Sequence, residues 1–480
     1  MKNLFSYMRD LPVFGAAAVV LALLCFGFAS HARAAQNLCS TPYETITTLR
    51  PPVFGIPPVW DARYAPAGTM VALVSGVPRE DGSIMAAGIR YKDDAGQPDE
   101  IVLVALNRRG RALVEVAHKA KPYEQPVKMI AHKGQYIVIS TIGNGESRPR
   151  QARIAWYSMS GRYLRDRLVG EAGFDYKAMA IKEKPDGAGL LAVFEAVSRD
   201  GRDYSHAVVM QLDGNGRTMW ERSYETGFSN RLRDLSYMGD GTYVAVGESR
   251  MEDGRHAGWI VQIAADGTLQ WQQVYPRGAG ASLYSAVRPS AQLDDRRGFL
   301  VSGRTDPLDG GGAAAWVMAL DESGTPQWQR FIRSAGYGFA ESWIRTHQDG
   351  RISLAVNARA QSGVPGARDH IRMLSFAPQA LLLTDEAYYA GIGARAGDIL
   401  SGRNDARVAV AGLVDDRDLR AARAEEQPVR VVGLLPERDS ALAPHEEDEI
   451  AMAQNPVDEG WILYATPLDP YDDPCAGYAP

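Results

Sequence analysis

The chain contains 480 residues, of which 45% are hydrophobic and 23% are charged, and its formal net charge is −6. No basic stripe or run of Lys and Arg interrupts this acidic balance. A nucleic-acid partner is therefore excluded, because it would need a cationic surface.

Residues 1–35 are typical of a secretory signal peptide. Cationic side chains precede an apolar run over 13–29, and small residues then predict cleavage after Ala34 or Ala35. The alternative is an uncleaved membrane anchor, but about 17 apolar residues are at the short limit for spanning a bilayer. We therefore expect a periplasmic or secreted protein with no stable membrane span after processing. Its mature net charge is −8, because cleavage removes three cationic and one anionic side chain.

Short apolar runs then recur with a period of somewhat over 50 residues. In three copies a glycine is followed four residues later by a tryptophan: Gly216 and Trp220, Gly267 and Trp271, and Gly324 and Trp328. Weaker copies around Gly110 and Gly161 lack the tryptophan, and a degenerate copy from Ile371 lacks the glycine. Each copy has an apolar run, a tight turn and a second alternating run, which predicts a two-stranded hairpin.

A second repeated phrase, offset by about half a period, places a short apolar strand after a turn. It occurs at Asp81-Gly82, Lys133-Gly134, Asp186-Gly187, Asp240-Gly241, Arg297-Gly298, Asp349-Gly350 and Asn404-Asp405. Asp-Gly pairs supply the positive φ values that hairpin turns need. With both phrases, each repeat contains four strands. The sequence therefore predicts an all-β fold, a seven-bladed β-propeller of four-stranded antiparallel blades.

The repeat resembles secreted bacterial β-propellers whose units read roughly DGGYVVAG and then DAWVVKLDSNGNIQWQKTYG. The likeness is strongest over 237–331 and covers most of 69–470 at the level of the fold. Quinoprotein and outer-membrane assembly propellers carry a related Asp-x-x-Gly-x-x-x-Trp phrase. The resemblance therefore implies a scaffold without assigning an activity.

The domain organisation follows from this repeat. Residues 36–68 are expected to form an N-terminal extension that joins the closing blade, and residues 69–480 the propeller domain. An acidic insertion around 436–458 interrupts the last repeat, and a strand is expected from Gly460. The insertion is interpreted as a solvated loop, with a partner-binding or cation-binding loop as the alternative.

Cleavage of the signal peptide discards Cys25 and leaves Cys39 and Cys475, one near each end of the mature chain. An even pair of cysteines in an oxidising compartment predicts a disulfide. A propeller brings its termini together, so this bond would hold the ring closed. The alternative is two unpaired thiols on terminal segments.

Trp220, Trp271 and Trp328 are predicted to be largely buried, each in the same position between neighbouring blades. A stacking platform for sugars or a quinone is the alternative. His132 and His347 precede equivalent turns and are interpreted as surface features of the repeat.

No cofactor is predicted, and no histidines stand at the spacing of a metal-binding pair. Ca²⁺ remains an option at two carboxylate clusters in predicted loops, although neither follows the ligand spacing of a calcium loop. The clusters are Asp93, Asp94, Asp99 and Glu100, and Asp415, Asp416 and Asp418.

These features favour a non-enzymatic binding or scaffold protein of the cell envelope, which holds an envelope protein or a glycan through its loops or central channel. The alternative is an enzyme, either a quinone-dependent dehydrogenase or a polysaccharide hydrolase or lyase. Seven repeats rather than eight, and the lack of a vicinal cysteine pair, argue against the dehydrogenase. The hydrolase lacks an acid/base pair that the sequence reveals. Charged side chains that converge at the channel mouth would favour an enzyme.

Overall fold

The computed structural model describes residues 42–464 apart from 55–59, 65–68, 80, 93–97, 108, 144–148, 202, 288–297, 308–310, 363, 365, 379, 389–392, 402–407 and 416–457. The chain divides into two compact units, residues 1–43 with 470–480, and residues 44–469. The strands described below belong to the second unit. Within the described residues, no helix has the length and apolar character needed to cross a membrane.

The described part of the chain is all-β, and its strands follow one another in runs of four. The first three runs are β3 (Thr69–Pro78), β4 (Ile84–Lys92), β5 (Pro98–Leu106) and β6 (Ala112–Lys119); β7 (Gln125–His132), β8 (Gln135–Ile142), β9 (Gln151–Ser158) and β10 (Tyr163–Val169); and β11 (Phe174–Glu183), β12 (Gly189–Ser198), β13 (Ser205–Asp213) and β14 (Thr218–Tyr224).

Three further runs have the same antiparallel order. They are β15 (Ser229–Tyr237), β16 (Tyr243–Arg250), β17 (His256–Ile263) and β18 (Leu269–Tyr275); β19 (Gly280–Val287), β20 (Gly298–Asp306), β21 (Ala314–Asp321) and β22 (Pro326–Ser334); and β23 (Tyr337–Thr346), β24 (Ile352–Ala360), β25 (His370–Phe376) and β26 (Leu382–Tyr388). The last strands are β27 (Gly393–Ser401), β28 (Val408–Asp415) and β29 (Asp458–Tyr464).

The N-terminal strands complete two of these sheets. β2 (Trp60–Tyr64) pairs antiparallel with β29, so the sheet of β27, β28 and β29 gains its fourth strand from the other end of the chain. β1 (Glu44–Leu49) adds in parallel to the outer edge of β22. The strand expected from Gly460 is β29.

Among the described strands, three sheets have four strands, one has eight and one has nine. The prediction of separate four-stranded antiparallel sheets therefore holds for three of them. In the larger sheets, two runs of four are joined by one residue pair each, Ser205 with Ser229 and Ser334 with Tyr337. The seven apolar runs predicted after turns all form strands, namely β4, β8, β12, β16, β20, β24 and β28.

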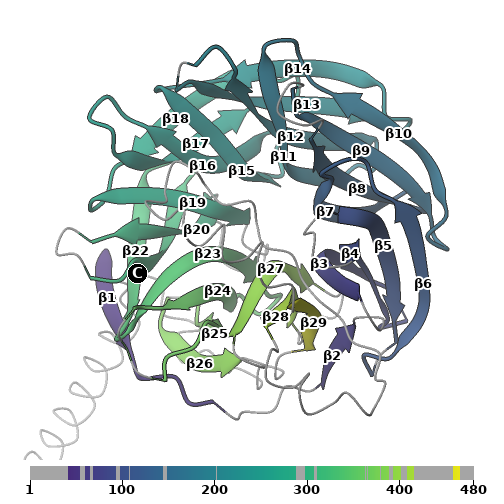
Figure 1. The fold of residues 1–480 in the computed structure, drawn as a ribbon. Coiled ribbons are helices and arrows are strands. Elements are labelled where there is room, and N and C mark those ends of the chain that lie inside the picture. The colour runs from purple at the N-terminus through teal and green to yellow at the C-terminus, as the bar shows by residue number, and fades with distance from the viewer. Residues whose placement is uncertain are drawn as a thin grey trace, which may run out of the picture. The chain divides into compact units, whose positions relative to one another are not determined.

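The first strand of each run lies on the inside of the arrangement (Figure 1). β3 packs against β7, β7 against β11, and the contacts continue through β15, β19 and β23 to β27, which packs against β3. The series of first strands is therefore closed. Fourth strands such as β10 and β14 are mostly exposed, whereas strands in the middle of a run, such as β17 and β25, are buried along their whole length.

The turns that follow β13 and β21 explain the Asp-x-x-Gly phrase. The Asp213 carboxylate accepts hydrogen bonds from the backbone N–H groups of Asn215 and Arg217, each at 2.8 Å. Gly216 follows with φ of +84°. Aspartate thus fixes the turn through its side chain, and glycine supplies the left-handed residue at no steric cost.

The same glycines pack against aromatic side chains of the preceding run. A Cβ on Gly267 would lie 2.8 Å from the Trp220 ring, and one on Gly324 would lie 2.8 Å from the Trp271 ring. The indole N–H of Trp220 donates to the backbone oxygen of Ala265 at 2.9 Å, across the boundary between runs. The glycine and the tryptophan of the phrase therefore interact between runs rather than within one.

Trp220, Trp271 and Trp328 lie on the equivalent strands β14, β18 and β22, but they are half-buried. The prediction that they would be largely buried is wrong, because a fourth strand has one face toward solvent. Among the described residues, the deeply buried tryptophans are Trp156, Trp259 and Trp316, which are 1%, 0% and 2% exposed and all lie on third strands.

We predict that Gly267→Ala will destabilise the protein more than Gly241→Ala. Both glycines have positive φ, so both substitutions carry the backbone strain of a left-handed residue. Only Gly267 faces a ring, whereas a Cβ on Gly241 would meet nothing within 4 Å. Overpacking adds about 1–3 kcal/mol, which urea unfolding of the two variants would measure. Equal losses would contradict the packing role of Trp220.

Candidate functional site

A pocket lies inside the closed series of first strands. Every first strand contributes to its lining, which also includes Thr141 of β8 and Glu195 of β12. Its volume is about 170 Å³. The site is therefore assembled from residues that lie as far apart in the sequence as Val74 and Asp398.

A β-bulge in each first strand places a residue against this pocket. In all seven first strands the pairing register with the second strand shifts near the middle of the strand. The residues skipped by these shifts that line the pocket are Val74, Val127, Met179, Arg233, Tyr284, Glu341 and Gly397. A bulge leaves a residue outside the ladder and redirects its side chain. The fold thus presents one variable position per first strand to a common centre.

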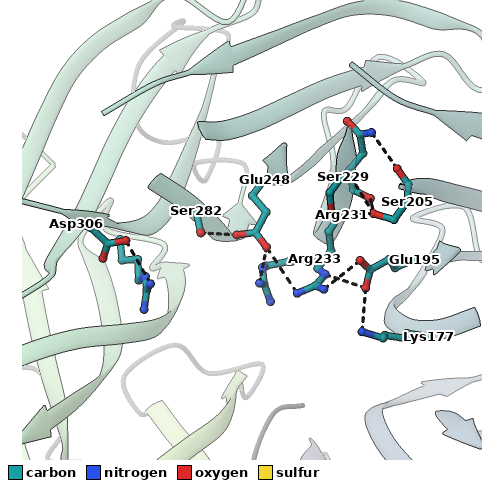
Figure 2. Close-up of polar contacts among 11 residues, drawn as sticks. Lys177, Glu195, Ser205, Ser229, Arg231, Arg233, Glu248, Ser282 and Asp306 are labelled. Carbon is teal, nitrogen blue, oxygen red and sulfur yellow. Dashed lines mark hydrogen bonds and ion pairs between the residues drawn. The ribbon is translucent and has the colours of Figure 1, made fainter. Parts of the chain in front are cut away.

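The β11 and β15 side of the pocket carries a network of charged side chains (Figure 2). Arg231 binds Glu195 through two nitrogens, with Nε 2.9 Å from Oε2 and a terminal nitrogen 3.0 Å from Oε1. The Lys177 ammonium lies 3.6 Å from the same carboxylate. Arg233 donates to Glu248 at 2.9 Å, and its guanidinium carbon lies 4.7 Å from the centre of the Tyr284 ring.

Two aspartates occupy equivalent positions directly after a bulge. Asp398 of β27 accepts a hydrogen bond from Ser75 at 2.6 Å and pairs with Lys128 at 2.5 Å. Asp234 of β15 accepts one from Ser285 at 3.2 Å and pairs with Lys182 at 3.0 Å.

In each case the serine also lies directly after a bulge, Ser75 in β3 and Ser285 in β19, the first strands that pack beside β27 and β15. β19 and β23 separate β15 from β27 on one side of the pocket, and β3, β7 and β11 separate them on the other. The two aspartates therefore face the pocket from opposite sides.

Between these aspartates, β19 and β23 contribute aromatic side chains and a third carboxylate. Tyr284 and Trp343 line the pocket and are half-buried. Glu341 accepts hydrogen bonds from Arg359 at 3.0 Å and from the Asn357 amide at 3.1 Å. This side can present flat apolar surface and a negative charge to a bound molecule.

The charges of these buried groups follow from their partners. Burial alone would raise the pKa of Glu195, but Arg231 and Lys177 lower it below its ordinary value. Burial is likewise outweighed at Glu341, whose pKa Arg359 and Asn357 lower. Both carboxyls are therefore ionised at neutral pH. Burial lowers the pKa of Lys128, and Asp398 opposes that shift.

We predict that Glu195→Gln will destabilise the protein by about 3–5 kcal/mol near neutral pH, because it removes the carboxylate charge that the buried Arg231 guanidinium contacts at 2.9 Å. The folded-state pKa of Glu195 is lowered from 4.5, so its contribution is present above that pH and is lost as the pH falls through the lower folded value. The difference from the unsubstituted protein should therefore shrink between about pH 7 and about pH 3 in urea unfolding. The exposed Glu221→Gln is the control, and a constant difference would contradict the prediction.

The structure places the residues singled out in the sequence away from this pocket. His132 is 3% exposed and bonds to Glu183 at 2.8 Å, and His347 is 5% exposed and bonds to Ser353 at 2.7 Å. Interpreting these histidines as surface features was therefore wrong. Trp220, Trp271 and Trp328 do not line the pocket.

Several predicted features lie outside the described residues, namely Cys39, Cys475, Asp93, Asp94, Asp416, Asp418 and the insertion around 436–458, apart from Asp458 at the start of β29. Glu100 pairs with Arg90 at 2.8 Å. Among the described side chains, no group of three or more His, Cys, Asp or Glu residues is arranged to hold a metal ion.

The pocket residues were missed because both repeated phrases cover second, third and fourth strands. First strands share no phrase, since the residue at the bulge varies among them. One signal was present: charged residues stand in the strands before the Asp-Gly turns, as at Lys177 in FDYKAMAIKE and Arg231 in SNRLRDLSY.

No protein-family model and no curated protein matches this chain. Similar solved structures include the Hadza microbial sialidase Hz136, with 13% identity, a TM-score of 0.41, and coverage of 60% of this chain and 63% of that chain. They also include the GH93 α-L-arabinofuranosidase of Fusarium graminearum, with 10% identity, a TM-score of 0.45, and coverage of 66% and 96%.

A puromycin hydrolase is similar with 12% identity, a TM-score of 0.46, and coverage of 72% of this chain and 50% of that chain. The chain thus spans less than two thirds of the sialidase and half of the puromycin hydrolase. At these identities the likeness concerns the fold alone.

The prediction of a non-enzymatic binding or scaffold protein is corrected by the pocket itself, because charged side chains converge on it, which is the arrangement expected of an enzyme. The similar structures include glycoside hydrolases and peptidases.

Proposed function

We propose that this chain is a hydrolase that cleaves glycosidic bonds of a polysaccharide in its central pocket. The observation that supports this proposal is the position of Asp234 and Asp398, which face one pocket from opposite sides. Glycoside hydrolysis needs two carboxyl groups that flank the scissile bond, one as general acid and one as base or nucleophile.

Other pocket residues fit this chemistry. Trp343 and Tyr284 offer ring faces on which a sugar can stack. Ser75 and Ser285 donate hydrogen bonds to the two aspartates, and Lys128 and Lys182 form ion pairs with them, which fixes the orientation of both carboxyl groups. One carboxyl would protonate the leaving group, and the other would act as base or nucleophile.

The test is the release of reducing ends from a panel of plant and bacterial polysaccharides by the full mature chain. Asp234→Asn and Asp398→Asn should each lower kcat at least about a hundredfold, because each removes an acid/base group. Glu221→Gln, an exposed carboxylate on β14, should retain full activity. Thermal unfolding would show that the variants are folded. Release from no member of the panel, or unchanged activity in both aspartate variants, would contradict the proposal.

We also propose that the strands form seven blades. The eight-stranded and nine-stranded sheets each divide naturally where a single residue pair joins two runs. Each resulting run has its own first strand with a bulge, which supports counting it as a separate blade. β1 then is an extra parallel strand on one blade rather than part of an eighth.

We further propose that the mature protein is periplasmic or secreted and that Cys39 and Cys475 form a disulfide. The pairing of β2 with β29 joins strands from opposite ends of the chain in one sheet, which supports a bond between the two terminal segments. The chain-entropy model gives such a crosslink about 5 kcal/mol of stabilisation. Titration of thiols in the unfolded mature protein without reductant should find none, and two free thiols would contradict the bond.

A further inference from the structure

The wall of the pocket formed by β11 and β15 carries more positive than negative charge. Its charged groups are four cations, Lys177, Lys182, Arg231 and Arg233, and three carboxylates, Glu195, Asp234 and the adjacent Glu248. This set has a net charge of +1. A bound anion would therefore complete the charge balance of the wall.

The carboxylates Glu195 and Glu248 are engaged mainly by the arginines. Arg231 spans both oxygens of Glu195 at 2.9 and 3.0 Å. Arg233 binds Glu248 at 2.9 Å, and Ser282 also donates to that carboxylate. Arg231 and Arg233 are therefore held in place by their carboxylate partners, because charge-assisted hydrogen bonds restrict the orientation of both side chains.

The lysines of the same wall are placed differently. The Lys177 ammonium is 3.6 Å from Glu195 Oε2, beyond hydrogen-bond distance, and that oxygen already contacts Arg231. The Lys182 side chain is 34% exposed, more than Lys128 or Arg233, and its contact with Asp234 uses one of three ammonium donors. Both ammonium groups can therefore turn toward a ligand at little cost.

We propose that Lys177 and Lys182 bind an oxyanion on the sugar, a carboxylate or a sulfate, so that the pocket takes an acidic saccharide. The inference rests on the proposed function, because it takes the ligand to be a sugar. Trp343 and Tyr284 line the same pocket from β23 and β19. The ring of the sugar stacks there while its anionic group reaches across to β11.

The contact between Lys182 and Asp234 places this anion-binding subsite beside a carboxyl group of the proposed hydrolytic site. The Lys182 ammonium can donate to an anionic substituent while it stays beside Asp234, because the Asp234 contact uses only one of its three donors. The recognised group would then lie next to one of the two proposed catalytic carboxyls.

The test is calorimetric binding of three probes to the full mature protein: trigalacturonate, a sulfated disaccharide and neutral galactotriose. At least one acidic probe should bind about tenfold or more tighter than the neutral one, and its affinity should fall between about 50 mM and about 300 mM salt. Whichever acidic probe binds identifies carboxylate or sulfate as the group recognised.

Lys182→Met and Lys177→Met should each weaken binding of that acidic probe by about tenfold and leave galactotriose unaffected. Lys184→Met is the matched control, because Lys184 pairs with Asp186 and does not line the pocket. Thermal unfolding checks each variant. Since Lys182→Met leaves Asp234 unpaired, Lys182→Met/Asp234→Asn provides a charge-balanced second variant, which should show the same loss.

Equal affinity for all probes, no binding of either acidic probe, or unchanged binding in both lysine variants would overturn the inference. These outcomes are separate from failure of the hydrolase. Tight binding of an acidic probe without bond cleavage would support the subsite and contradict the hydrolase, whereas cleavage of neutral polymers without binding of either acidic probe would do the reverse.

Discussion

The contact between a turn glycine and an aromatic ring of the preceding run sets the spacing of the whole arrangement. Gly216 lies against Trp156, Gly267 against Trp220 and Gly324 against Trp271, and no Cβ fits at these positions without a shift. Tyr224 and Tyr275 then donate to the carbonyl oxygens of Gly267 and Gly324 at 2.6 Å. Such contacts fix the distance and the angle between one run and the next. The closure of the first strands into one series depends on that regularity.

Because the closure is regular, the interior can vary. Each first strand has a bulge at a similar height, and the skipped residue is free to be valine, methionine, arginine, tyrosine, glutamate or glycine without altering the ladder beside it. The scaffold and the site are thus carried by different strands. The outer strands determine the packing, and the innermost strands determine the chemistry.

The pocket has a chemical asymmetry that a purely structural role would not need. Buried ion pairs seldom stabilise a protein more than apolar residues of similar volume, because desolvation offsets the attraction. This chain nevertheless keeps Glu195, Arg231 and Glu248 in contact beside Lys177, and it places Tyr284 and Trp343 on the next two first strands. These charges fit the acidic saccharide that we propose as the ligand.

The sequence by itself determined the strand content and the repeat. Asp-Gly turns and the glycine–tryptophan spacing are local signals, since a positive φ and an Asx turn depend on neighbouring residues. The burial of the tryptophans could not be derived in this way, because exposure depends on whether a strand lies in the middle of a run or at its outer edge. Trp220 and Trp259 are both strand residues, yet one is half-buried and the other is fully buried.

Only the tertiary structure decided the site. Asp398 meets Ser75 over a separation of 323 residues and Lys128 over 270, and no local pattern contains such a relation. The bulges that aim these side chains shift the register by one residue, which changes the face that a residue presents while leaving the apolar pattern readable. The pocket residues thus come together because the first strands pack into a closed series. The repeat in the sequence indicates that series, but it does not show which residues face one another across it.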